Sequence, residues 1–395
     1  MAIQSKRATL DELYEEWERE EISPFFPVIE ENNGNSVTTD RHQNLLMFGS
    51  CDYLGLSQDP ALKAGAIRGI ERYGTNTYGA QLLCGHTRIH HEVEERLTAL
   101  SPAHSAILFP SGMAANLALI SAMASSEDVI LNDRTDHVSI FMGSTLSGAE
   151  MRTFPHNNMA KLESLLRQYG EKRRRIIIVD GLYSADGDFA PLDRIAELAA
   201  EYDARILVDE AHSFGIVGPN GLGVAEHFGV LDQVDAIVGT MSKALGSVGG
   251  FVLARKPLER ELRYMAPSYT SSRGSAPGVA GATLASLSEL ATRGPELRQR
   301  LADNVALILG RLRKAGIDLM KTRSHIVPVL IRDERKTVEV ANWLMEHGVF
   351  TAAFVYPHVP MGTGRLRVGV TSRHTTEECE RLVELLVEAR DKFSF

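Results

Sequence analysis

The sequence predicts an α/β protein in which a mostly parallel β-sheet is buried between helices. Short, fully apolar segments such as Ile176–Val179 and Ile206–Val208 alternate with segments whose apolar residues recur at helical spacing. Repeated strand–helix units of this length indicate parallel strands, and strands buried on both faces are continuous apolar runs. The 395 residues are 44% hydrophobic and 24% charged, which is typical of a globular protein large enough for two domains.

The N-terminal elements precede this alternation. Thr9–Glu12 has the form of a capping box, and a helix with one apolar stripe should follow it. The stripe consists of Leu10, Leu13, Tyr14 and Trp17. Ser23–Pro27 should end this helix, because proline removes a backbone donor. Leu45–Phe48 is a predicted strand, so residues 1–58 form an N-terminal helix and strand segment.

From Pro60 onward helices and strands alternate, and residues 59–293 form the predicted large domain. Its predicted strands are 106–109, 129–131, 176–179, 204–208 and 235–239, and its predicted helices include 111–123, 159–169 and 192–202. We expect Thr292–Pro295 to separate this domain from a smaller α/β domain at 294–395. That domain should contain an amphipathic helix from Leu297 to Leu312, strands at 326–331 and 365–370, and a last helix at 376–390.

The bulk properties exclude some classes of partner. A net charge of −9 argues against nucleic acid or an anionic membrane as the main partner. Cys51, Cys84 and Cys379 lack metal-ligand spacing, so neither a metal site nor a disulfide framework is expected. No apolar run is long enough to span a bilayer, and no secretory signal is evident at Met1–Arg7, which makes the cytoplasm the expected location.

Three chemically reactive side chains follow two neighbouring predicted strands. Asp209 and His212 come directly after one strand, and Lys243 follows the next. Ligands of open α/β sheets bind at the carboxyl ends of strands, where all three would lie. A lysine amine can form a Schiff base with the aldehyde of pyridoxal phosphate (PLP), a carboxylate can keep its pyridine nitrogen protonated, and a histidine can contact its phenolic oxygen. Each residue alone is equally compatible with a solvated strand end or a structural loop.

The segments Val208–His212 and Thr240–Gly246 resemble the cofactor-lysine signature of the α-oxoamine synthases, which are class II aminotransferase-like enzymes of PLP fold type I. The resemblance extends from about Phe25 to Arg373. It implies a large domain with a seven-stranded, mostly parallel sheet and a smaller C-terminal α/β domain. It also implies PLP as cofactor, and a homodimer with the active site between subunits.

The resemblance assigns roles to further residues. Ser111, Gly112 and Met113 match the turn that cradles the PLP phosphate, where a helix N-terminus also favours an anion, although Ser111 alone could be an ordinary helix cap. The remaining matches to cofactor-binding residues are His137 on the ring face, Ser184 near the phenolic oxygen, Thr240 at the phosphate, and Ser272 reaching the phosphate of a neighbouring subunit. Asp209, His212, Lys243 and His137 are the implied catalytic residues.

The implied substrate-binding residues are Arg367, Tyr53 and Ala80. Arg367 matches an arginine that holds the substrate α-carboxylate by bidentate pairing, with Arg365 as the alternative. Two positions depart from the family pattern. Cys51 stands where relatives have asparagine, and Ala80-Gln81 stands where they have serine or threonine followed by arginine. A small, apolar Ala80 suggests an amino-acid substrate larger than glycine.

The implied reaction is a decarboxylative condensation of an α-amino acid with an acyl thioester of coenzyme A or an acyl carrier protein. Its products are an α-amino ketone, CO2 and a free thiol. Phe25–Pro27 and Gly49–Gly55 slightly favour the serine palmitoyltransferase-like branch. Another PLP reaction of the same fold type, such as amino transfer or decarboxylation, would use the same Lys243 and Asp209. A non-catalytic partner subunit is a third interpretation, which the presence of both residues disfavours.

Overall fold

The computed structural model describes residues 12–395, which form two compact units. One unit comprises the chain up to Tyr53 together with Ala185–Gly187 and Gln299–Phe395, and the other comprises Leu54–Ser184 and Asp188–Arg298. The N-terminal segment thus joins the C-terminal part of the chain in one unit, although the two were predicted as separate segments. The capping box predicted at Thr9–Glu12 falls outside the described residues except for Glu12.

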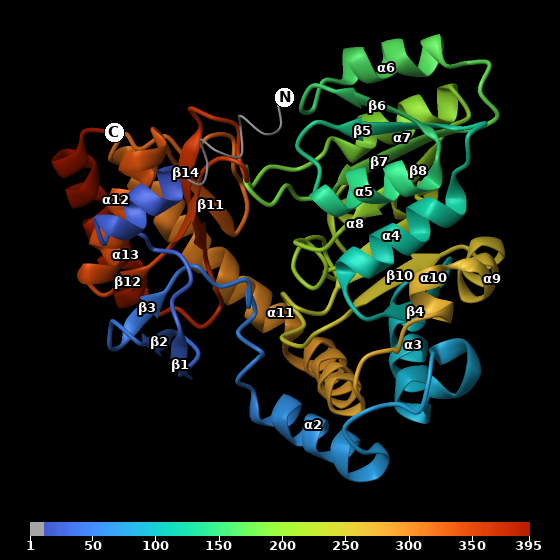
Figure 1. Cartoon of the computed structure of the whole chain (residues 1–395), viewed down its shortest axis with the longest axis horizontal. Helices are drawn as coiled ribbons and strands as arrows, with labels where there is room; N and C mark the ends of the chain where they lie inside the picture. The colour runs from blue at the N-terminus through green and yellow to red at the C-terminus, as the bar shows by residue number, and fades with distance from the viewer. Residues whose placement is uncertain (1–11) are drawn as a thin grey trace. The chain divides into compact units, whose positions relative to one another are not determined.

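The larger unit is built on a seven-stranded sheet in the order β4-β10-β9-β8-β7-β5-β6 (Figure 1). Its strands are β4 (Ser105–Phe109), β5 (Val129–Asp133), β6 (Glu150–Phe154), β7 (Arg175–Asp180), β8 (Arg205–Asp209), β9 (Ala236–Thr240) and β10 (Gly250–Ala254). Only β10 runs antiparallel to its neighbours, and the other adjacent pairs are parallel. This confirms the predicted seven-stranded, mostly parallel sheet of fold type I.

Helices connect and cover these strands. They are α2 (Pro60–Tyr73), the π-helix η1 (Gln81–Gly85), α3 (Arg88–Leu100), α4 (Gly112–Met123), α5 (Val138–Ser147), α6 (Met159–Gln168), α7 (Leu192–Glu201), α8 (Val224–His227), the 3-10 helix η2 (Leu231–Gln233), α9 (Lys256–Met265) and α10 (Pro267–Thr270). The predicted helices at 111–123, 159–169 and 192–202 agree with α4, α6 and α7.

Strand periodicity determines which polar residues reach the site. Ile178 and Leu207 pack in the core cluster that includes the α4 residues Ala115 and Leu119. Because successive side chains alternate between faces, the residues two positions further, Asp180 and Asp209, lie on this same face at the carboxyl ends of β7 and β8. The sheet therefore carries two acidic side chains next to each other at the edge where its apolar core ends.

The smaller unit contains two further sheets. One has the order β1-β2-β3-β12, with β1 (Ile29–Asn32), β2 (Ser36–Thr39), β3 (Leu45–Met47) and β12 (Val349–Phe350), and the other has the order β11-β14-β13, with β11 (Ile326–Arg332), β13 (Ala352–Phe354) and β14 (Gly364–Gly369). The helices are α12 (Glu334–Glu346) and α13 (Thr376–Phe393). Residues 12–19 are helical, and Trp17 of the predicted stripe is buried against Val338 and Val355.

The predicted start of a helix at Leu297 is wrong, because α11 (Pro277–Lys314) is one helix of 38 residues that continues through Thr292–Pro295 with Pro295 inside it. A proline removes one backbone hydrogen bond of a helix, and the packing of Leu287, Leu297 and Leu301 on both sides of it keeps the helix continuous. The boundary between the units falls after Arg298, five residues beyond the predicted boundary after residue 293. Neither α11 nor any other helix in residues 12–395 is apolar enough over a sufficient length to cross a membrane.

Candidate active site

A cavity of about 220 Å³ lies at the carboxyl ends of β7, β8 and β9 in the larger unit. Nine residues that the sequence analysis singled out line it together: Ser111, Gly112, Met113, His137, Ser184, Asp209, His212, Thr240 and Lys243. They come from segments up to 132 residues apart in the chain. The sheet topology brings them together, since each follows a strand or begins the helix after one.

The start of α4 forms one end of the cavity. Ser111 caps this helix, accepting a hydrogen bond from the Ala114 N–H at 3.1 Å. A Cβ atom on Gly112 would lie 3.2 Å from Thr240 Cβ, so glycine lets the first turn of α4 approach Thr240 closely. The Thr240 and Ser242 hydroxyls are 2.9 Å apart. Helix N–H groups beside hydroxyl groups suit a phosphate, and these residues fit the phosphate of PLP.

The acidic end of the cavity is held by a chain of hydrogen bonds. Asp209 accepts from Asn116 Nδ2 at 2.6 Å and from the Ala211 N–H at 2.8 Å. Asn116 also donates to Ser139 Oγ at 2.9 Å, and Ser139 Oγ lies 2.7 Å from His137 Nδ1. The network fixes the Asp209 carboxylate, which fits the protonated pyridine nitrogen of PLP.

The protonation state of His137 follows from its surroundings. Burial lowers the pKa of His137, the Asp209 carboxylate opposes this shift, and the nearby Lys243 ammonium adds to it, so that the pKa is lowered overall. A neutral imidazole ring at neutral pH can stack on an aromatic cofactor without adding charge to the cavity. This state suits the ring-face role that the resemblance implies for His137.

Other residues of the site were not predicted from the sequence. Asn116 and Ser139 complete the Asp209 network, and Asp180 and Ser242 line the cavity. Two signals could have identified some of them. Asn116 is a polar residue inside an apolar helix, and Asp180 ends an apolar strand in the same manner as Asp209.

Two predicted residues of the larger unit, Ala80 and Ser272, do not line the cavity. Ala80 forms an isolated β-bridge with Arg273, so the two segments lie side by side. Ser272 is exposed, and Tyr78 close by is 89% exposed. These segments thus form an exposed surface outside the cavity of their own chain.

Arg367 and Tyr53 lie in the smaller unit. Arg367 Nη2 donates to Cys51 Sγ at 3.2 Å, and its guanidinium carbon lies 4.6 Å from the centre of the Phe354 ring. Tyr53 is fully buried, and burial together with its contacts to Cys51 raises its pKa well above the usual range although Arg367 opposes this. Cys51 thus occupies the position of the missing asparagine and contacts the predicted carboxylate-binding arginine.

The alternative residue, Arg365, has a different environment. Arg365 is buried and forms an ion pair with Asp186, whereas no carboxylate in residues 12–395 forms an ion pair with Arg367. Arg365 therefore stabilises the fold, and Arg367 keeps a guanidinium fork that an added carboxylate can pair with.

A charged histidine lies between two carboxylates of the larger unit. His156 Nδ1 lies 3.1 Å from Asp133 Oδ1, and His156 Nε2 lies 3.0 Å from Asp188 Oδ2. Burial alone would lower the His156 pKa, but hydrogen bonds to the two carboxylates outweigh it and raise the pKa to about 10. Asp186 and Asp188 are thus each paired with a cationic side chain of the protein.

This pairing predicts a pH-dependent stability. The folded-state pKa of His156 exceeds the unfolded value of about 6.5, so its contribution is complete below that pH and is lost as the pH rises through about 10. His156→Gln should lower the free energy of unfolding by about 1–3 kcal/mol at pH 6, and by less at pH 10. Denaturant unfolding at several pH values measures this, with His91→Gln as a control. An unchanged difference across this range would contradict the assignment.

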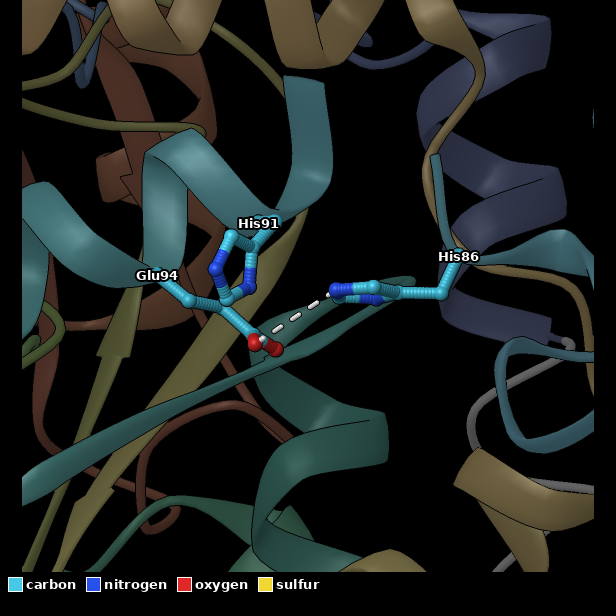
Figure 2. A group of neighbouring side chains, drawn as sticks. All are labelled: His86, His91 and Glu94. Atoms are coloured by element: carbon cyan, nitrogen blue, oxygen red, sulfur yellow. Dashed lines mark ion pairs between the residues drawn. The ribbon is translucent and has the colours of Figure 1, made fainter. Parts of the chain in front are cut away.

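A second histidine cluster lies away from the cavity. Figure 2 shows Glu94 and His91 on α3 beside His86, with His86 Nε2 3.8 Å from Glu94 Oε2. Their donor atoms all lie within 4.8 Å of one another, a spacing that could hold a metal ion. However, Glu94 also binds Arg263 at 2.9 Å and accepts the Leu108 N–H at 3.2 Å. A metal ion would be repelled by the guanidinium beside it, so we assign the cluster to packing of α3 against β4 and α9.

Known proteins share this architecture. A family model described as aminotransferase class I and II matches residues 43–386. The chain is 37% identical to an 8-amino-7-oxononanoate synthase from Citrifermentans bemidjiense over 92% of this chain and 94% of that protein. It is 36% identical to a serine palmitoyltransferase from Sphingobacterium spiritivorum over 97% and 96%. A solved serine palmitoyltransferase variant from S. paucimobilis, with PLP and myriocin bound, matches with a TM-score of 0.95 and 30% identity over 99% of this chain and 98% of that chain.

Proposed function

The chain belongs to the class I and II aminotransferase family and, within it, to the PLP-dependent α-oxoamine synthases, and on this premise we propose that it condenses an α-amino acid with an acyl thioester. A bond forms between the amino-acid Cα and the acyl carbon, the thiol leaves, and the α-carboxylate departs as CO2. The single observation that supports this most is the cavity in which Lys243, Asp209 and His137 meet a helix N-terminus.

When bound, PLP supplies an aldehyde that captures amines and a ring that accepts the electrons of a carbanion. The residues of the chain bind and orient the reactants. The α4 N-terminus and Thr240 hold the phosphate, and Asp209 keeps a proton on the ring nitrogen. Lys243 holds the cofactor before the amino acid arrives, and its amine then removes the Cα proton and returns it to the product.

The amino-acid carboxylate is assigned to Arg367. Its guanidinium has no carboxylate partner in the described part of the chain, and Phe354 and Cys51 fix its direction. Arg367→Lys should raise KM for the amino acid by about 10–100-fold, because lysine lacks the bidentate fork. Steady-state kinetics at a saturating acyl donor tests this. Arg365→Lys is the matched control and should lower thermal stability rather than raise KM. An unchanged KM in Arg367→Lys would remove Arg367 from the substrate site.

The comparisons support two branches of the family, and the proposed substrate depends on the branch. Sequence identity to 8-amino-7-oxononanoate synthase and to serine palmitoyltransferase is nearly equal, whereas the TM-score is 0.95 for a solved serine palmitoyltransferase and 0.77 for an 8-amino-7-oxononanoate synthase from Francisella tularensis. We propose the serine palmitoyltransferase-like branch, with an amino acid larger than glycine. Because Ala80 lies outside the cavity of its own chain, it would be next to this amino acid only in the cavity of a second copy. Coenzyme A or an acyl carrier protein would deliver the acyl group.

An amino-acid panel tests the activity directly. Purified protein with PLP is mixed with glycine, L-alanine, L-serine and larger amino acids, and the cofactor absorbance is recorded. Acyl-CoA donors of several chain lengths are then added, and free thiol and CO2 are measured. Release of both with one amino acid supports the proposal. A spectral change without thiol release from acyl-CoA or acyl carrier protein would favour amino transfer or simple decarboxylation. Glycine as the best substrate would refute the role of Ala80.

We also propose that two copies of the chain form a homodimer in the cytoplasm. Large apolar side chains are exposed on the larger unit. Tyr78 and Leu83 lie near Ala80 in the chain, Tyr264 and Met265 lie at the end of α9, and each is more than 60% exposed. A surface of this kind suits a protein interface, and a partner's Ser272 could then reach a phosphate as the resemblance implies. Sedimentation equilibrium of the PLP-loaded protein should give twice the chain mass, and an active monomer would contradict this proposal.

A further inference from the structure

A buried carboxyl group next to Asp209 lines the active-site cavity and has no role in the reaction described above. Asp180 ends β7, is only 3% exposed, and is one of the cavity-lining residues. In the parallel register of β7 and β8 it is the partner of Asp209. Adjacent strands are about 5 Å apart, so two carboxyl groups stand side by side on the same face of the sheet.

The two carboxyl groups are not equally supplied with hydrogen-bond donors. Asp209 accepts from the Asn116 side chain and from the Ala211 N–H. Asp180 has a weaker set, because the backbone N–H of His137 donates to its carboxyl group but its Oδ1 is buried with no partner in residues 12–395. A buried negative charge requires donors. The structure therefore stabilises the charge on Asp209 better than a charge on Asp180.

The charges around Asp180 also favour its neutral form. Four charged or titratable groups interact with the Asp180 carboxyl group. They are Asp209 at the end of β8, Asp133 at the end of β5, Asp136 in the loop after β5, and Lys243 after β9. Burial and the Asp209 charge raise the pKa of Asp180 well above the usual range, although Lys243 and the backbone N–H of His137 oppose this. Two like charges at this separation in a low-dielectric site repel each other strongly. One lysine ammonium cannot neutralise both neighbouring carboxylates.

We infer that Asp180 is a neutral carboxylic acid in the resting enzyme, which offers an O–H donor beside the bound cofactor and leaves Asp209 as the single charged carboxylate among the cavity-lining residues. The inference rests on the proposed PLP site. Asp180 is thus a positioning residue: because it carries no charge, it does not compete with Asp209 for the proton on the ring nitrogen or with the cofactor for the Lys243 amine.

The Asp180→Asn variant tests whether Asp180 is a neutral carboxylic acid or a charged carboxylate. Asparagine keeps the shape, the neutrality and a donor, so PLP affinity should stay within about threefold of the parent protein. Asp209→Asn is the comparator and should weaken PLP binding by at least ~100-fold, because there the charge itself is needed. Asp180→Ala removes the donor and should fall between the two. Fluorescence titration of the apoprotein with PLP gives all three affinities.

Infrared difference spectra test the protonation state without any activity. The parent protein at pH 7 should show a protonated-carboxyl band that is missing from Asp180→Asn and retained in Asp209→Asn. Asp136→Asn serves as a second control, because its own buried carboxyl has a raised pKa and should account for a different band. A parent spectrum identical to that of Asp180→Asn would overturn the inference, as would a loss of PLP affinity in Asp180→Asn equal to that of Asp209→Asn. A protein that binds PLP but transfers no acyl group would refute the proposed function. The PLP affinities and the infrared bands would still test the protonation state of Asp180.

Discussion

Lys243→Ala is expected to remove almost all activity, with kcat falling by about 10⁴-fold or more. Two functions are lost together, since the same amine holds the cofactor and moves the proton at Cα. Alanine supplies neither nucleophile nor base, and no other lysine lines the cavity in the described part of the chain. Thiol release at saturating amino acid and acyl thioester measures the rate. Mass spectrometry after borohydride reduction should find the cofactor on Lys243 in the parent protein and on no lysine in the variant.

The control for this experiment is Lys256→Ala, which removes an exposed lysine at the start of α9 and should leave the rate unchanged. Lys243→Arg adds a second comparison, because it keeps a positive charge beside Asp180 and His137 but lacks a free amine. Activity restored by arginine would show that Lys243 acts only as a charge. The proposed role of Lys243 as nucleophile and base would then be wrong.

Asp209→Asn is expected to lower kcat/KM on the order of 10²–10³-fold while the protein stays folded. The amide keeps the shape and the contact with Asn116, but it can no longer hold a proton on the ring nitrogen electrostatically. The ring then accepts carbanion electrons poorly, and proton removal at Cα slows. Exchange of the Cα proton into D2O, measured by NMR without an acyl donor, isolates this step. Asp193→Asn, an exposed carboxylate in the first turn of α7, should leave exchange unaffected.

The size of the Asp209 effect also tests the hydrogen-bond network. Asn116→Ala removes one donor and leaves the charge, so we expect a loss of about tenfold, smaller than that of Asp209→Asn. If Asn116→Ala and Asp209→Asn lose equal activity, the orientation of Asp209 matters for the reaction and its charge does not. Asp209→Glu distinguishes these further, because it keeps the charge and shifts its position.

Local patterns were enough to predict the larger unit. Apolar runs such as Ile176–Val179 are buried on both faces of the sheet, and this burial makes a parallel strand recognisable in the sequence. Lys243 and Asp209 were identified for a related reason, since Asp209 directly follows one such run and Lys243 stands three residues after the end of another. The helix start at Leu297 was predicted wrongly because a proline removes only one hydrogen bond, and packing along the rest of α11 outweighs this loss.

The sequence by itself determined the fold class, the family and most of the reactive groups, because these depend on residue type at strand ends and on short motifs. Tertiary structure alone decided which polar residues support those groups. Asn116 reaches Asp209 across 93 positions, His156 bridges Asp133 and Asp188, and Asp180 stands beside Asp209 only through the register of β7 and β8. Hydrogen bonds and charge repulsion depend on separations of a few ångströms between distant segments, and only the packed sheet and helices determine these separations.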